Sequence, residues 1–248
     1  MEAVDRSDAL NVRLGAINAL GRRHTSPDLS SPCVSRALAD PCPDVRLASV
    51  VAIQRFGSDS DKAVPNLIVV ATTDVDERVR VAAVAALGHV HSQPKNSVPL
   101  LIRALSDESP SVRAAAAIAL RRFGSDAALG VAALTKAVTD VNADVRGETI
   151  RTLTALGPHA AEAVPSLIEN LRNEDAEISR LAAGALRRIG STSEKTVNSL
   201  LAATKAARPH VRRNTLWVLG STTASSQKTT LRLIGLNDAA AHWIVGRQ

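Results

Sequence analysis

Arginine carries most of the binding chemistry that this sequence offers. The chain of 248 residues has a net charge of +6, with 24 Arg and six Lys against 24 acidic residues. The charge is uneven: residues 178–248 hold 11 basic and two acidic residues, whereas residues 1–177 hold 19 basic and 22 acidic ones. A guanidinium binds carboxylates and phosphates through paired hydrogen bonds. The last third of the chain is therefore expected to meet an acidic partner.

Other kinds of chemistry have little support. The aromatic side chains are Phe56, Phe123, Trp217 and Trp243. So few rings argue against flavin or haem pockets and against base-stacking platforms. Two cysteines, Cys33 and Cys42, are too few for a disulfide framework and lack the spacing of a zinc site. No nucleophile elbow or phosphate loop is present. We expect no catalytic residues, no metal and no cofactor.

The chain also lacks targeting features. No apolar stretch approaches the roughly 18 residues that span a membrane. The polar start of the sequence has no basic region followed by an apolar one, so it does not read as a secretory signal. A cytoplasmic protein without a membrane segment is the expectation.

The elements that must position the arginines repeat along the chain. An apolar anchor recurs at steps of 33 or 34 residues: Val12, Val45, Val79, Val112, Val145, Ile178 and Val211. Eight residues after each anchor stands a second aliphatic residue: Leu20, Ile53, Leu87, Leu120, Leu153, Leu186 and Leu219. Self-similarity at such a period is typical of repeat architectures.

Each repeat is predicted to be a pair of helices. Apolar residues four, five, eight and eleven positions after the anchor fall on one face of an amphipathic helix of about three turns. Glycines are expected to end four of these helices: Gly57, Gly124, Gly157 and Gly190. A second apolar segment begins at Val64, Val98 and Val164, and the proline after each suits a first helical turn. No segment alternates as a strand does.

Residues 107–120, with the sequence DESPSVRAAAAIAL, resemble the short HEAT repeat of the phycobilisome-lyase type. The resemblance covers almost the whole chain. It implies an all-α, right-handed α-solenoid (superhelix) of about seven HEAT-like helix pairs, similar to armadillo folds. It also implies a single domain over residues 1–248, with partial units at residues 1–10 and 239–248. Because such repeats serve many unrelated scaffolds, the resemblance is specific for fold and not for function.

The resemblance gives a recurring Asp and Arg a structural role. The Asp precedes the anchor by five residues and the Arg follows it directly, and in HEAT repeats these residues form a ladder. The expected members are Asp40, Arg46, Asp74, Arg80, Asp107, Arg113, Asp140 and Arg146. An Asp in this turn can also cap the helix that follows.

A second set of residues is expected on the exposed face, two, six, nine and ten positions after the anchor. In the later repeats these positions hold Arg121, Arg122, Arg151, Arg180, Arg187, Arg188, Arg213 and Trp217. We call this set the arginine strip. In two earlier repeats these positions hold Leu47, Val51, Gln54 and Arg55, or Val81, Ala85, Gly88 and His89. Since second helices line the concave surface of HEAT solenoids, the strip predicts a basic concave surface. A general compositional preference for Arg is the alternative.

The favoured function is a non-catalytic scaffold for protein–protein interaction, binding an acidic partner protein along the concave face. Trp217 fits the role of a binding anchor. Nucleic-acid binding is one alternative, because phosphate contacts alone give salt-sensitive affinity. A phycobilin-lyase-like enzyme or its partner subunit is another, although nothing marks a bilin site. HEAT-repeat deoxyhypusine hydroxylases bind iron through His-Glu pairs, and no His in this chain is followed by Glu.

Overall fold

The computed structural model describes residues 10–22, 27–190 and 193–221, and every regular element in these ranges is helical. The chain falls into two compact units, residues 1–130 and residues 131–248, each of which is described by itself. The expected partial repeats at the two ends lie almost wholly outside the described residues, as does Trp243.

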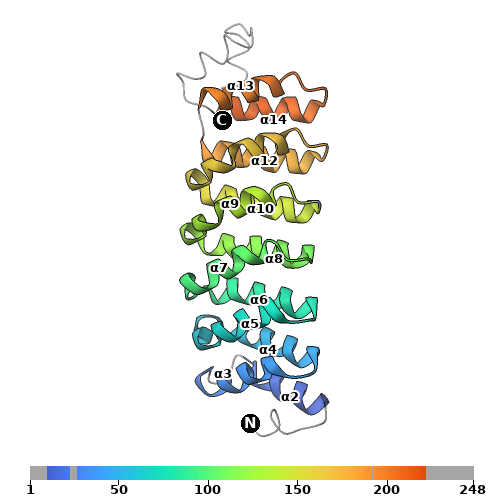
Figure 1. Ribbon diagram of the computed structural model, residues 1–248, viewed down its shortest axis with the longest axis vertical. Coiled ribbons are helices and arrows are strands. Elements are labelled where there is room, and N and C mark those ends of the chain that lie inside the picture. The colour runs from blue at the N-terminus through green and yellow to red at the C-terminus, as the bar shows by residue number, and fades with distance from the viewer. Residues whose placement is uncertain (1–9, 23–26, 191–192, 222–248) are drawn as a thin grey trace. The chain divides into compact units, whose positions relative to one another are not determined.

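In the first unit, helices pack in two layers (Figure 1). The α-helices are α2 (Leu10–Leu20), α3 (Pro27–Arg36), α4 (Pro43–Phe56), α5 (Val64–Thr73), α6 (Glu77–Val90), α7 (Pro94–Ala104) and α8 (Pro110–Arg122). Short 3-10 segments are η1 (Ala37–Ala39), η2 (Gly57–Ala63) and η3 (Gly124–Gly130). The helices α2, α4, α6 and α8, which carry the anchors, pack successively against one another, and α3, α5 and α7 pack against them.

The second unit repeats this arrangement. It contains α9 (Val131–Ala137), α10 (Ala143–Leu156), η4 (Gly157–Ala163), α11 (Val164–Leu171), α12 (Ala176–Ile189), α13 (Glu194–Ala203) and α14 (Pro209–Gly220). The anchor helices α10, α12 and α14 pack in succession, with α9, α11 and α13 against them. The all-α class and the stacked helix pairs of an α-solenoid are confirmed.

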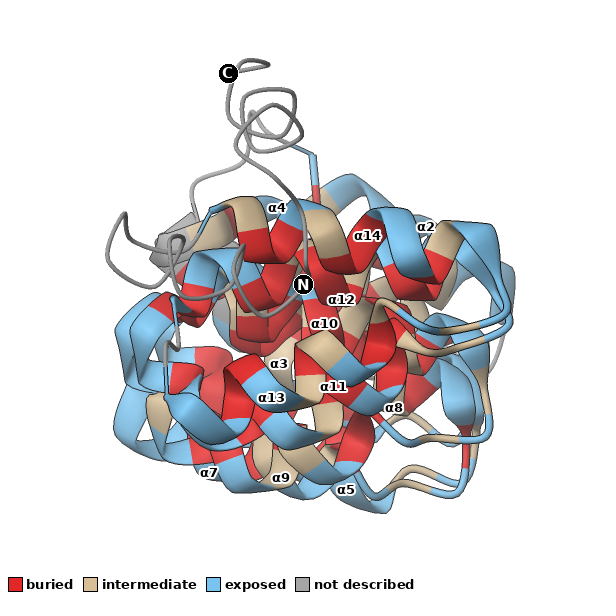
Figure 2. Ribbon diagram, turned by 90° about the horizontal axis from the view of Figure 1, so that it is seen from above, coloured by how far each residue is buried: buried red, intermediate tan, exposed pale blue. Residues whose placement is uncertain are grey.

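The anchors form the core of both units. Six of the seven are at most 3% exposed: Val45, Val79, Val112, Val145, Ile178 and Val211. Figure 2 shows such buried residues on the sides that the helices turn toward one another. The prediction is wrong for Val12, which is 47% exposed. Among the described residues no helix precedes α2, so nothing in that part of the chain covers its outer side.

Glycine ends the predicted helices as expected. Gly57, Gly124, Gly157 and Gly190 have φ angles of 60°, 52°, 56° and 74°. Positive φ angles favour glycine, because glycine has no Cβ that would clash with the backbone. Each glycine therefore lets the chain turn from an anchor helix toward the next element.

The start of α7 differs from the prediction. The sequence predicts a helix from Val98, with Pro99 in its first turn, but α7 begins at Pro94 and contains Pro99. Proline at this point removes the hydrogen bond to the carbonyl of Lys95, four residues earlier. Lys95 is an exposed residue of the first turn of α7.

Gly88 was expected on the exposed face of its helix, and the structure contradicts this. A Cβ at Gly88 would lie 2.8 Å from both the Cα and the Cβ of Ala119 on α8. The anchor helices α6 and α8 approach each other here, so Gly88 is buried. Position nine after the anchor therefore faces the neighbouring helix in this repeat.

We expect Gly88→Ala to lower the free energy of unfolding, because overpacking against the α8 backbone costs about 1–3 kcal/mol. The better helix propensity of alanine returns about 1 kcal/mol at most. Gly184→Ala is the matched control, since a Cβ there meets no atom within 4 Å. It should raise stability by up to about 1 kcal/mol. Urea unfolding of the two variants measures this difference, and an equal gain in both would contradict the close approach.

Candidate functional site

The second unit carries most of the arginine strip. Its members there project from the three anchor helices α10, α12 and α14 and are exposed: Arg151, Arg180, Arg187, Arg188, Arg213 and Trp217. Because α12 packs against both α10 and α14, these side chains belong to one helical layer. The packing of the repeats thus brings together residues that are up to 66 positions apart in the sequence.

Arg187 and Trp217 make direct contact within this layer. The guanidinium carbon of Arg187 lies 4.1 Å from the centroid of the Trp217 ring. A cation over an indole face is attracted by the ring electrons. Trp217 remains 47% exposed beneath it. The pair presents a flat, partly apolar surface with a positive charge on top.

Arg188 and Arg213 add charge without local compensation. Both are exposed, and neither guanidinium group makes a hydrogen bond or ion pair with any residue that the structure describes. A guanidinium that keeps all its donors free can bind a carboxylate or a phosphate without first breaking an internal ion pair. This part of the strip is therefore the most available to an anionic partner.

The remaining two arginines of the strip in this unit are paired with acids that the sequence analysis did not consider. Arg151 Nη1 lies 2.9 Å from Glu148 Oε1 and its Nη2 lies 3.7 Å from Glu177 Oε1. Arg180 donates to both Glu177 oxygens, at 2.8 and 2.6 Å. The hydrogen bond from Arg180 lowers the pKa of Glu177, which is thus firmly ionised. Each Glu precedes an Arg by three positions, a helical spacing that would have revealed the pairs.

Two members of the strip lie in the first unit, on and near the end of α8. Arg121 is partly buried and Arg122 is exposed. Arg122 Nη1 lies 3.1 Å from His89 Nδ1 on α6. Partial desolvation, together with the positive charge of Arg122, lowers the pKa of His89. A neutral imidazole there accepts the guanidinium hydrogen bond.

The recurring Asp and Arg make regular contacts in the first unit. Arg46 donates from Nε and Nη2 to the two Asp74 oxygens, both at 2.7 Å. Arg13 pairs with Asp40 at 2.9 Å, and Arg80 pairs with Asp107 at 3.1 Å. The Arg of one repeat thus holds the Asp of the next.

The same Asp residues also organise the turn in which they lie. Asp74 Oδ1 accepts the N–H of Asp76 at 2.9 Å, and Asp107 Oδ1 accepts the N–H of Ser109 at 2.9 Å. The helix N-caps are those later residues, Asp76 and Ser109, whose side chains accept N–H bonds of the first turn. The recurring Asp therefore positions the cap residue and does not itself cap the helix.

Two further predicted ladder residues, one in each unit, make the same local contacts. Arg113, in the first unit, donates from Nη1 to the carbonyls of Asp107 and Glu108, both at 2.9 Å. Asp140, in the second unit, accepts the N–H of Asn142 at 2.9 Å. Their local contacts match those of the other repeats.

The ladder loses its acid in the second unit. Position 173, which pairs by spacing with Arg146, is Asn instead of Asp. Arg146 Nη1 donates to the carbonyls of Asp140 and Val141, but no carboxylate contacts the guanidinium among the described residues. Its Nε is buried without a hydrogen-bond partner.

The described ranges contain neither a cluster of metal-binding side chains nor a helix of membrane-spanning character. These contain no group of three or more His, Cys, Asp or Glu side chains placed to hold a metal ion. None of the helices described combines the length and apolarity needed to cross a bilayer.

The chain matches a known family of repeat proteins. A family model described as HEAT repeats matches residues 1–88, 64–131 and 131–220. These ranges cover most of the chain and contain all seven anchors. The match does not identify the narrower subfamily of phycobilisome-lyase-type HEAT repeats. A search of curated proteins returned no match.

Several solved structures share the fold at low sequence identity. An engineered protein is 20% identical with a TM-score of 0.63, covering 98% of this chain and 71% of its own. A designed armadillo repeat protein in complex with the peptide (KR)4 is 17% identical with a TM-score of 0.59, covering 77% and 99%. A computationally designed armadillo repeat protein for modular peptide recognition is 15% identical with a TM-score of 0.56, covering 77% and 99%. At these identities the likeness concerns the fold alone.

Proposed function

The chain belongs to the HEAT-repeat family, and we propose that it is a non-catalytic interaction module that binds an acidic protein partner through the arginine strip. The observation that carries this proposal is the stacked pair of Arg187 and half-exposed Trp217, flanked by Arg188 and Arg213. Tryptophan and arginine are the residue types that most often dominate binding energy at protein interfaces.

Charge argues for the acidic nature of the partner. The peptide bound by one designed armadillo neighbour, (KR)4, is basic. A basic peptide would be repelled by the uncompensated guanidinium groups of this chain, so the charge preference is expected to be reversed here. Electrostatic attraction would also speed the encounter with an acidic partner.

The test is binding of a fluorescent poly-Glu peptide to the full chain across a salt series. The triple variant Arg187→Gln, Arg188→Gln, Arg213→Gln is expected to bind at least about tenfold more weakly at low salt, because it loses about 1.4 kcal/mol or more of charged contacts. A control variant with Lys95→Gln, Arg103→Gln and Lys136→Gln loses the same charge from exposed positions that are not two, six, nine or ten residues after an anchor. It should bind nearly as the natural sequence does.

The same titration separates the nucleic-acid alternative. Duplex DNA and RNA of equal charge density replace the peptide. If DNA or RNA binds more tightly than the peptide at physiological salt, and the triple variant loses this binding, the strip is a nucleic-acid site. If both triple variants weaken peptide binding equally, the strip acts only as part of the general surface charge, and the proposal is contradicted.

A further inference from the structure

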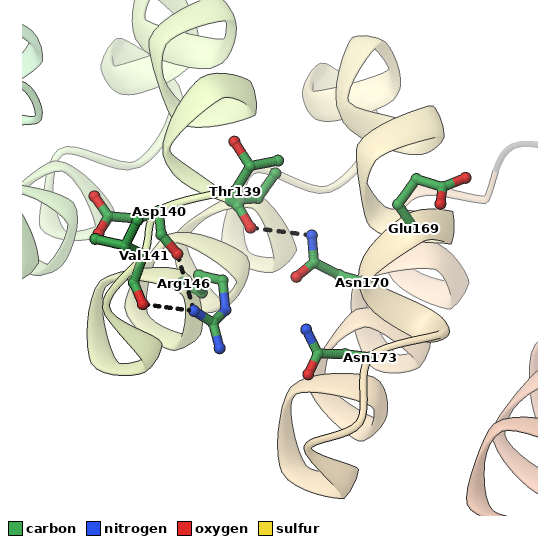
Figure 3. Close-up of a pocket in the computed structure, with 8 residues that line it drawn as sticks. Thr139, Asp140, Val141, Arg146, Glu169, Asn170 and Asn173 are labelled. Carbon is green, nitrogen blue, oxygen red and sulfur yellow. Dashed lines mark hydrogen bonds between the residues drawn. The ribbon is translucent and has the colours of Figure 1, made fainter. Parts of the chain in front are cut away.

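A surface pocket lies where the ladder lacks its acid. It measures ≈ 440 Å³ and is bounded by the turn after α9, by Arg146 on α10 and by the end of α11. Figure 3 shows Arg146 on one side and Asn170, Asn173 and Glu169 on the other. Its rim includes Val141, which is 93% exposed, so the pocket is open to solvent. None of its residues belongs to the arginine strip.

Arg146 is held in the orientation of a complete rung. Its Nη1 donates to the carbonyls of Asp140 and Val141 at 2.9 and 3.1 Å. Arg46 Nη1 makes the same two contacts, to Asp40 and Pro41, at 2.9 and 3.1 Å. These bonds give the two guanidinium groups the same orientation relative to the turn that precedes each helix. In both residues the edge formed by Nε and Nη2 takes no part in these bonds to the carbonyls.

What differs is the occupant of that edge. In Arg46 it is filled by the Asp74 carboxylate through two bonds of 2.7 Å. In Arg146 the Nε is buried and has no partner, and Nη2 makes no hydrogen bond with the described residues. A buried donor without an acceptor is costly, so an acceptor that displaces the atoms now covering Nε gains the benefit of satisfying it.

Asn173 explains why the edge is empty. Its Oδ1 accepts the N–H of Asp175 at 2.9 Å, as the Oδ1 of Asp74 does from Asp76. The atom in the place of the second carboxylate oxygen is then the amide nitrogen Nδ2, a donor. A donor cannot accept from the Arg146 Nε, so the natural residue leaves the rung open and adds a further N–H beside it.

We propose that this pocket binds a carboxylate group, which completes the rung between Arg146 and Asn173 from outside the chain. The carboxylate receives hydrogen bonds from Arg146 Nε and Nη2 and from Asn173 Nδ2. The planar guanidinium edge matches two carboxylate oxygens, as the Arg46 rung demonstrates. The acids Asp140 and Glu169 also line the pocket, and they repel a doubly charged phosphate about twice as strongly as a singly charged carboxylate.

The test follows the Arg146 Nε–H resonance of the full chain by NMR during titration with sodium acetate at constant ionic strength. We expect a saturable shift of this resonance. Asn173→Asp supplies the acid from within, so it should weaken acetate binding at least tenfold and raise the melting temperature. Arg55→Gln, which removes a charge elsewhere, should leave the titration unchanged.

Two further titrations distinguish the source and the class of ligand. A short peptide with a single Glu that saturates at lower concentration than acetate would identify the side chain of a partner protein as the occupant. Saturation by acetate alone would identify a small carboxylic acid. Phosphate or chloride shifting the resonance as strongly as acetate would overturn the proposal, as would unchanged acetate binding in Asn173→Asp. The melting temperature of each variant shows that it is folded.

Discussion

Leu120→Ala and Leu153→Ala are each expected to lower the free energy of unfolding by about 2–5 kcal/mol, the cost of removing a buried leucine and leaving a cavity. Leu120 in the first unit and Leu153 in the second are both 0% exposed. Each stands eight residues after its anchor, on the buried face of α8 or α10. Because neighbouring helices of a repeat hold this face from several sides, it can close only partly around the missing atoms.

Two surface truncations control for the loss of hydrophobic atoms as such. Leu129→Ala lies in the first unit, where the residue is 82% exposed, and Val141→Ala in the second, where it is 93% exposed. Both are expected to change stability by less than about 0.5 kcal/mol. Urea denaturation followed by circular dichroism measures all four variants. Stability unchanged by either core substitution would show that the register of that repeat is wrong.

Asp74→Ala is expected to cost about 3–5 kcal/mol, because it removes one partner of a largely buried ion pair. The side chains of Arg46 and Asp74 are 12% and 4% exposed, and two bonds of 2.7 Å join them. Without the carboxylate the Arg46 charge stays away from solvent with only carbonyl partners. The Asp76 N–H loses its acceptor as well.

Asp44→Ala is the matched control in the same unit. Its carboxylate pairs with Arg78 at 3.2 Å, but the two side chains are 53% and 60% exposed. An exposed pair of this kind contributes less than about 1 kcal/mol. Chemical unfolding at neutral pH compares the two variants, and equal losses would contradict a structural role for the Asp74 rung.

The Asp74 rung also predicts a loss of stability in acid. Burial raises the pKa of Asp74, but hydrogen bonds from Arg46 and from the Asp76 N–H outweigh it, so the pKa lies below the ordinary 3.8. A carboxyl whose pKa is lower in the folded protein contributes stability above its ordinary pKa and loses it as the pH falls through the folded pKa. The natural chain should therefore lose more stability below about pH 4 than Asp74→Ala does. Parallel acid unfolding curves for the two proteins would refute this.

The amino-acid sequence by itself determined the architecture of the repeats. A period of 33 or 34 residues reports which residues share one helix face, and that information is local. It therefore identified the core anchors and the glycines that end helices, including Gly57 and Gly190 with φ angles of 60° and 74°. It also showed the excess of Arg in the last third of the chain.

The tertiary structure alone decided which side chains meet between repeats. It placed Arg187 on Trp217 and buried Gly88 against Ala119. These contacts join residues about 30 positions apart. They depend on how closely two helices approach and on which rotamer each side chain adopts, and a helical period contains neither quantity. The chemistry of this protein therefore depends on packing distances that the repeat pattern leaves open.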